Sequence, residues 1–374
     1  MKKQKVFIRL ANIVVTILSV MFILVYGNNE NLAEVSPSIY VTDIKINPQN
    51  TNELYAGIRG NGLYRSADKG ETWIRCGVEI ESFNTGIAKI AFDPIEKNVY
   101  VGTPNGLFTR HADRNWVKLE GFDDVSKIFI QPTDQSRVIY VDASSGLYVS
   151  TVEGGWRRRG RPVELRTVNS ILYPVAIDPS VPGNIVYFAL IDNTIIAITG
   201  DDPVVNVGNN ISGIYKSNNH EMTLEKILST SSGILLISSK DANVMYGVNR
   251  NIILKSIDGG ASWKEISKFG NNNNKVVDIL VMDPVDHNIL YSKISDYGTV
   301  YRQPFLFKSI DGGKTWQEIT SASSFMSSVN NITLDPLNQD ILYIGTSGKG
   351  IFKSTDAGKT WKAINKGIEL SKNN

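Results

Sequence analysis

The sequence predicts an all-β fold made of repeated four-stranded units. Three observations lead to this expectation. The nine-residue stretch "KSIDGGKTW", residues 308–316, recurs in close variants along the chain. A longer unit of 30 residues, clearest at 332–361, recurs around it. Nothing in residues 40–368 sustains the 3.6-residue periodicity of a helix over three turns. Repetition of this kind is typical of folds built from stacked or ring-closed units.

The short motif predicts a structural hairpin turn between the third and fourth strands of its unit. Its copies share a serine, an aspartate, a glycine and a tryptophan, at Ser66, Asp68, Gly70 and Trp73; Ser256, Asp258, Gly260 and Trp263; Ser309, Asp311, Gly313 and Trp316; and Ser354, Asp356, Gly358 and Trp361. Ser and Asp side chains accept hydrogen bonds from nearby N–H groups, and glycine supplies the positive φ of a tight turn. The tryptophan is expected to pack between strands. A calcium loop is the rival interpretation, but each copy offers one carboxylate where such loops use several.

The longer unit reads as four strands in a fixed order. Its clearest form, "ITLDPLNQDILYIGTSGKGIFKSTDAGKTW", returns at 44–73 as "IKINPQNTNELYAGIRGNGLYRSADKGETW". Short β-branched and aromatic runs alternate with Gly, Asn and Pro turn signals. Residues 40–368 divided by seven give about 47 residues per unit, a length expected of propeller blades. The predicted fold is therefore a seven-bladed β-propeller of four-stranded antiparallel blades over residues 40–368.

The two ends of the chain read differently from the repeats. Basic residues at positions 2, 3, 5 and 9 precede an apolar run over 13–26, a pattern typical of export signals. Residues 1–27 are therefore predicted to be a signal peptide or an N-terminal membrane anchor, with a buried helix as the other interpretation. Residues 28–39 read as a linker and 369–374 as a tail. Either form of the segment places the propeller outside the cytoplasm, in a periplasmic or extracellular compartment.

Composition excludes several classes of function. The net charge of +2 over 374 residues argues against a nucleic-acid partner, which usually requires a strongly basic domain. Cys76 is the single cysteine, so an intrachain disulfide and a cysteine-based zinc site are excluded. The histidines at 111, 220 and 287 have no metal-ligand spacing. No metal and no cofactor are therefore expected.

The motif resembles the Asp-box, or BNR repeat, of sialidase-like and sortilin-like propellers, in which it is a structural hairpin. Seven such units behind an export signal resemble the photosystem II assembly and stability factors, lumenal or periplasmic propellers that help to insert and protect a reaction-centre protein. The resemblance implies a non-enzymatic, exported scaffold or assembly factor that binds a protein partner, such as a membrane protein or an acidic segment. The scaffold is expected to be a monomer that associates with the membrane through its N-terminal segment.

The stretches that break the repeat are the predicted places for function. The segment 154–166 concentrates five arginines, Arg157, Arg158, Arg159, Arg161 and Arg166, and the resembled family carries an arginine-rich patch. Insertions are expected at 198–212 and 295–304. The order of strands puts both insertions and 161–166 on the face opposite the motif turns, where loops can bind a partner. Alternatively, the arginines are solvated charges that protect an edge strand.

An enzyme is the alternative function. Glycoside hydrolysis needs two positioned carboxylates. The aspartates of the repeated strand ends read as structural: Asp43, Asp93, Asp178, Asp283 and Asp335. Sialidases carry an Arg-Ile-Pro segment that is absent here, and two-propeller glucanases hold their acids between two rings. The sequence therefore predicts a non-enzyme, with a glycan-binding or glycoside-hydrolase propeller of the sialidase or endo-glucanase kind as the alternative.

Overall fold

The computed structural model describes residues 38–77, 80, 87, 89–111, 114–132, 137–144, 146–151, 154–159, 171–177, 186–191, 212–218, 223–270, 274–298, 304–319 and 329–368. The chain divides into two compact units, residues 1–38 and 39–374, and every described strand belongs to the second. The predicted signal or anchor, residues 1–27, lies outside the described residues. Within them, no helix has the length and apolar character needed to span a bilayer.

All regular secondary structure of the described residues is β-strand. The first half of the unit contains β1 (Ile39–Ile46), β2 (Leu54–Ile58), β3 (Gly62–Ser66), β4 (Ile74–Cys76), β5 (Lys89–Phe92), β6 (Asn98–Thr103), β7 (Gly106–His111), β8 (Val117–Leu119), β9 (Val125–Pro132), β10 (Arg137–Ala143), β11 (Gly146–Thr151), β12 (Gly154–Arg159), β13 (Ile171–Ile177) and β14 (Val186–Ile191). The second half contains β15 (Gly213–Asn218), β16 (Thr223–Leu228), β17 (Leu235–Ile237), β18 (Met245–Asn249), β19 (Ile252–Ser256), β20 (Lys264–Lys268), β21 (Lys275–Met282), β22 (Leu290–Asp296), β23 (Pro304–Ser309), β24 (Gln317–Glu318), β25 (Val329–Asp335), β26 (Asn338–Gly348), β27 (Ile351–Ser354) and β28 (Lys362–Ala363).

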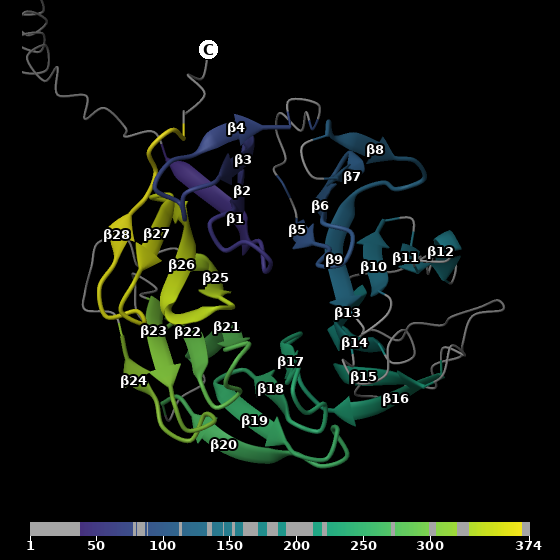
Figure 1. The fold of residues 1–374 in the computed structure, drawn as a ribbon. Helices are drawn as coiled ribbons and strands as arrows, with labels where there is room; N and C mark the ends of the chain where they lie inside the picture. The colour runs from purple at the N-terminus through teal and green to yellow at the C-terminus, as the bar shows by residue number, and fades with distance from the viewer. Residues whose placement is uncertain are drawn as a thin grey trace, which may run out of the picture. The chain divides into compact units, whose positions relative to one another are not determined.

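The strands pair in chain order into small antiparallel sheets arranged as a β-propeller. Each run of four consecutive strands, such as β5–β8 or β21–β24, is hydrogen-bonded to its sequence neighbours. Figure 1 shows the sheets of the second unit set around a centre, with the first strand of each sheet innermost. The predicted all-β fold of four-stranded antiparallel units is therefore confirmed.

The first and last sheets are joined directly. Strand β1 pairs with β26 through Ile39↔Gly348 and Tyr40↔Ser347, which merges β1–β4 and β25–β28 into one sheet. Side chains of β25 continue this seam, because Asn330 Nδ2 donates to Val41 O at 3.0 Å and Thr333 Oγ1 donates to Ile44 O at 2.8 Å. These bonds connect positions 289 residues apart, and they close the ring.

Apolar clusters fill the spaces between neighbouring sheets. Second strands contribute tyrosines to these clusters, and the fully buried ones are Tyr55, Tyr140, Tyr246, Tyr291 and Tyr343. Lysines of the third strands lie over three of these rings, with Lys255 Nζ 5.0 Å from the centroid of Tyr246 and Lys308 Nζ 5.3 Å from that of Tyr291. Burial of the phenol raises the pKa of Tyr246 to about 12. A tyrosine covered by a lysine is thus a repeated element of the core.

The repeated Ser-x-Asp turn has one geometry in its four copies. In the β23–β24 copy, Ser309 Oγ donates to Asp311 Oδ1 at 2.8 Å and accepts from the N–H of Gly313 at 2.9 Å. The same carboxylate accepts from the N–H of Thr315 at 2.9 Å and from its hydroxyl at 2.6 Å. Gly313 has φ +87°, the left-handed conformation that favours glycine. Both carboxylate oxygens are therefore used within the turn itself.

These turns predict that stability depends on pH at the acidic end. Hydrogen bonds from Thr315, Thr360 and Ser262 lower the pKa of Asp311, Asp356 and Asp258 to about 2. A folded-state pKa below the unfolded value adds stability above pH 4, and this stability is lost as pH falls from about 4 to about 2. We expect Asp311→Asn to lower Tm by about 2 °C at pH 7, a modest shift because the turn is exposed.

Thermal melts of the wild type and Asp311→Asn at pH 7, 4, 3 and 2 check this expectation. The gap between the two Tm values should narrow as pH falls, because the wild-type carboxylate becomes protonated and loses its advantage over the amide. A gap that stays constant from pH 7 to pH 2 would contradict it.

Candidate functional site

A cavity of about 380 Å³ lies beside the inner strands β1, β21 and β25. Its lining residues are Tyr40, Thr42, Asp278, Ile279, Lys293, Val329 and Asn330. They lie near the beginnings of these three strands and at the adjoining part of β22. Because successive strands run in opposite directions, this end of the sheets is opposite the Ser-x-Asp turns. We call this site the inner-strand cavity.

Asp278 provides the carboxylate of the inner-strand cavity. Its Oδ2 lies 3.3 Å from Lys293 Nζ and accepts a hydrogen bond from the hydroxyl of Ser295. The side chain of Asp278 is 23% exposed and that of Lys293 is 16% exposed, so the ion pair is partly removed from water and still accessible. A ligand in the cavity therefore meets a hydrogen-bond acceptor and a charged donor side by side.

Other aspartates of the inner strands are used by the backbone. Oδ2 of the buried Asp43 accepts from the N–H of Ile90 in the next sheet at 2.9 Å. The carboxylates of three other buried aspartates accept hydrogen bonds from backbone N–H groups of the following turn, at 2.8–3.1 Å: Asp93, Asp283 and Asp335. These contacts agree with the structural role expected from the sequence, while Asp178 lies outside the described residues. The carboxylate of Asp278, in contrast, contacts the side chains of Ser295 and Lys293.

A second accessible carboxylate, Asp142, lies on β10 at the same end of the sheets. Its Oδ2 accepts from Ser126 Oγ at 2.7 Å, and its backbone is paired with that of Lys127. Burial raises the pKa of Asp142, although Ser126 and Lys127 act in the opposite direction. Burial also lowers the pKa of Lys127 to about 8, against the attraction of Asp142. This carboxyl therefore holds a proton to a higher pH than an ordinary aspartate does.

Asp142 and Lys293 occupy a place that three other sheets give to glycine and the β17–β20 sheet gives to Val248. The equivalent glycines are Gly57, Gly102 and Gly345. Each lies two residues after the buried tyrosine of its second strand and is paired with a residue of the inner strand. A Cβ at these glycines would lie 2.5–2.6 Å from Ile87, which precedes β5, from Val125 of β9 or from Val41 of β1. Placing a charged side chain at such a crowded position costs folding free energy, so its presence indicates a function other than stability. Alignment of the repeats at the "LYxG" pattern is the sequence signal by which these two residues could have been found.

The rest of the inner-strand cavity offers aromatic and neutral polar groups. The guanidinium of Arg59 lies 5.2 Å from the centroid of the Tyr40 ring. Asn330 donates to Val41 O and accepts from Ser347 Oγ at 2.8 Å, so its amide is held in one orientation. An aromatic ring beside fixed donors and acceptors suits a ligand rich in hydroxyl groups, which needs both polar partners and an apolar surface.

The predicted arginine site is described only in part. Arg157 and Arg158 are exposed on β12, the outermost strand of its sheet, and Arg159 belongs to the same strand. Arg161, Arg166 and nearly all of the insertion at 198–212 lie outside the described residues. Arg157 and Arg158 are not among the residues that line the inner-strand cavity, and the role of the five arginines in binding stays a prediction.

Comparison with curated proteins identifies glycoside hydrolases. No protein-family profile matches the chain. The xyloglucanase Xgh74A of Acetivibrio thermocellus is 25% identical over 320 residues, which are 80% of this chain and 32% of that protein. The oligoxyloglucan-reducing end-specific xyloglucanase of Emericella nidulans is 26% identical over 244 residues, 60% of this chain and 27% of that protein. The chain thus spans about a third or less of the length of these relatives.

Solved structures share the fold. A GH74 enzyme from Niastella koreensis matches with a TM-score of 0.65 and 20% identity, covering 88% of this chain and 55% of that one. YCF48 from Cyanidioschyzon merolae matches with a TM-score of 0.58 and 13% identity, covering 85% of this chain and 96% of that one. At these identities, the likeness establishes the propeller fold alone.

The comparisons correct the functional prediction. The sequence was interpreted as a non-enzymatic, protein-binding scaffold, and this interpretation is wrong, because the matching curated relatives are named xyloglucanases. The prediction rested on the aspartates of the repeated strand ends, which were expected to be structural. It did not consider Asp278 and Asp142, whose carboxylates lie elsewhere in their strands and accept hydrogen bonds from side chains.

Proposed function

We propose that residues 39–368 form a seven-bladed propeller that acts on β-linked glucans as a glycoside hydrolase of the xyloglucanase type. The observation that carries the proposal is the inner-strand cavity, where Asp278, Lys293, Asn330 and Tyr40 surround one space. The similarity to xyloglucanases over most of the chain supports the same class of substrate. The strand groupings and the closure of β1 on β26 support seven blades.

Glycoside hydrolysis needs two carboxyl groups that flank one bond, about 5–10 Å apart. One group must donate a proton to the leaving oxygen, and the other must be ionised to activate water or to attack the sugar. Asp278, in an ion pair with Lys293, is suited to the ionised role. Asp142, whose pKa is raised by burial, lies on β10 of a different sheet and has no contact with Asp278 among the described residues, so the proposal does not assign the two carboxyl groups to the same bond.

Two further assignments belong to this proposal. The Ser-x-Asp turns are Asp-box repeats with a structural role, supported by the identical hydrogen bonding of their copies. The protein is exported, supported by the basic and apolar pattern of residues 1–27 and by the polymeric nature of the substrate, which a cell meets outside.

Incubation of the full chain with xyloglucan, carboxymethylcellulose and glycogen tests the proposal. We expect new reducing ends from at least one of the β-glucans and retarded migration in gels that contain it, with neither effect for glycogen. Retardation without new reducing ends would support glycan binding and overturn hydrolysis. The absence of both effects for every β-glucan would overturn the whole proposal.

A further inference from the structure

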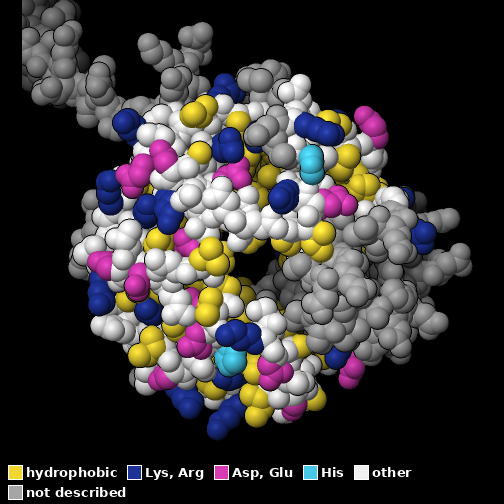
Figure 2. Space-filling model, in the orientation of Figure 1, with side chains coloured by type: hydrophobic (Ala, Val, Ile, Leu, Met, Phe, Trp, Pro, Cys, Tyr) yellow, Lys and Arg dark blue, Asp and Glu magenta, His cyan; other side chains and the backbone are white. Residues whose placement is uncertain are grey.

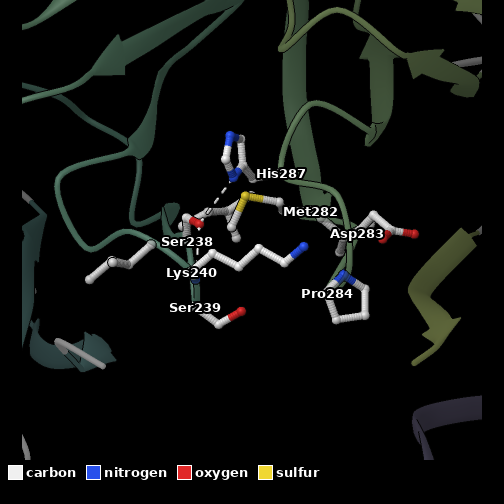
Figure 3. A pocket seen from close by; sticks show the side chains of 10 residues that line it. Ser238, Ser239, Lys240, Met282, Asp283, Pro284 and His287 are labelled. Atoms are coloured by element: carbon white, nitrogen blue, oxygen red, sulfur yellow. Dashed lines mark hydrogen bonds between the residues drawn. The ribbon is translucent and has the colours of Figure 1, made fainter. Parts of the chain in front are cut away.

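A second cavity, of about 340 Å³, lies at the opposite end of the sheets (Figure 3). We call it the turn-side cavity. The segment that ends β17 and follows it contributes Leu236, Ile237, Ser238, Ser239 and Lys240. The corresponding segment at the end of β21 contributes Val281, Met282, Asp283, Pro284 and His287. The cavity therefore lies between two neighbouring sheets, next to their first turns.

Ser238 occupies the position that three other described sheets give to a buried aspartate, namely Asp93, Asp283 and Asp335. Its hydroxyl accepts from the N–H groups of Lys240 at 3.2 Å and Asp241 at 3.3 Å. Asp283, in the neighbouring turn, accepts from the N–H groups two and three residues on, both at 2.8 Å. The serine caps the turn as the aspartate does, but it is shorter and carries no charge. One buried negative charge of the repeat is therefore missing at this place.

His287 replaces a second element of the repeat. It lies four residues after Asp283, as Gln339 lies four residues after the equivalent Asp335. Gln339 Nε2 donates to Asp283 Oδ1 of the preceding sheet at 3.3 Å. His287 Nδ1 lies 3.4 Å from Ser238 Oγ of its own preceding sheet (Figure 3). An amide and a carboxylate are thus exchanged for an imidazole and a hydroxyl between these two sheets.

Lys240 adds a positive charge without a counter-ion. Its side chain extends toward the segment that carries Met282 and Pro284 (Figure 3), and its ammonium has no hydrogen bond or ion pair to any residue that the structure describes. The neighbouring carboxylates are used by their own turns. Asp283, which also lines the cavity, accepts from two backbone N–H groups at 2.8 Å. Asp286 accepts from Asn288 N at 2.9 Å and Asp241 accepts from Asn243 N at 3.0 Å. The cavity therefore combines an unpaired cation with a largely apolar wall.

We propose that the turn-side cavity binds a small organic carboxylate with an apolar body. The carboxylate would take the place of the missing aspartate charge, beside Lys240 and within reach of His287 and the Ser239 hydroxyl. The apolar body would lie on Leu236 and Met282. The volume equals that of about ten water molecules, which suits a ligand with about ten non-hydrogen atoms. The site is at the other end of the sheets from Asp278, so it stands independently of the proposed hydrolysis.

Calorimetric titration of the full chain with benzoate tests this site. We expect saturable binding that weakens at least tenfold in Lys240→Met, which keeps the length and apolar character of the stem and removes the charge. The matched control is Lys268→Met, an exposed lysine at the end of β20, and its affinity should equal that of the wild type. Benzyl alcohol, which keeps the ring and lacks the charge, should bind at least tenfold more weakly than benzoate.

A second variant probes the missing charge directly. Ser238→Asp restores the residue type of the other turns, and the aspartate should repel a bound carboxylate and abolish benzoate binding, with Tm equal to or above that of the wild type. No saturable binding of benzoate or hexanoate to the wild type would overturn the proposal. Equal affinity of the wild type and Lys240→Met would also overturn it.

Discussion

Replacement of Asp278 by asparagine is expected to lower the rate of β-glucan hydrolysis by roughly two to four orders of magnitude. Asparagine keeps the size of the side chain and the hydrogen bond to Ser295, but it can neither be ionised nor activate water. Because Asp278 contacts Ser295 and Lys293 rather than a buried backbone group, the fold should tolerate the change. Release of reducing ends, measured beside a thermal melt, checks both parts.

The matched control is Asp340→Asn, which changes an exposed aspartate at the opposite end of the sheets. Its rate of hydrolysis should equal that of the wild type. The rate of Lys293→Met should lie between those of Asp278→Asn and Asp340→Asn, because this variant keeps the carboxylate of Asp278 but removes its ion-pair partner. A rate for Asp278→Asn within threefold of the wild-type rate, at unchanged Tm, would remove Asp278 from the reaction.

Trp73→Ala is expected to give the largest loss of stability among the tryptophans of the turns. The Trp73 side chain is 2% exposed, and its indole N–H donates to Ile364 O at 2.7 Å. Its backbone N–H donates to Lys366 O at 2.9 Å, so Trp73 binds the segment after β28 to the first sheet. Loss of a buried tryptophan costs about 3–5 kcal/mol, and here the cavity would open at the seam that closes the ring.

Trp316→Ala is the control, because Trp316 has the same place in its own turn without touching the seam. Its indole is partly exposed and donates to Gly313 O within the same turn at 3.0 Å. Urea unfolding should show a loss of unfolding free energy for Trp73→Ala at least about 1 kcal/mol greater than for Trp316→Ala. Equal losses would mean that the seam adds nothing to stability.

Much of the architecture could be read from local signals. The glycine of each Ser-x-Asp turn has a positive φ, and proline or asparagine residues lie at strand ends. Both features are predictable because the backbone preferences of these residues depend on a few adjacent atoms. The face of the molecule seen in Figure 2 carries interspersed acidic and basic side chains, as the near-neutral composition suggests. Such features recur because each sheet contains the same types of turn and strand end.

The candidate site was less predictable, because it is formed by exceptions to the repeat. Asp278 follows an ordinary apolar pair in β21, and nothing in its own strand distinguishes it from a solvent-facing residue. Its significance depends on Lys293 and Ser295 of β22, and on Tyr40 and Asn330, whose strands are far away in sequence. Sequence proximity had instead favoured the arginines of β12, which are adjacent along the chain.

The sequence by itself determined the all-β repeat, the turns and the order of strands, because these depend on side-chain period and on turn chemistry within about 50 residues. Only the tertiary structure decided how β1 meets β26 and which charges share a cavity. Those features depend on contacts between positions up to 291 residues apart, such as Trp73 and Ile364. Closure of the ring brings such positions together, and no local preference of the chain encodes which of them will meet.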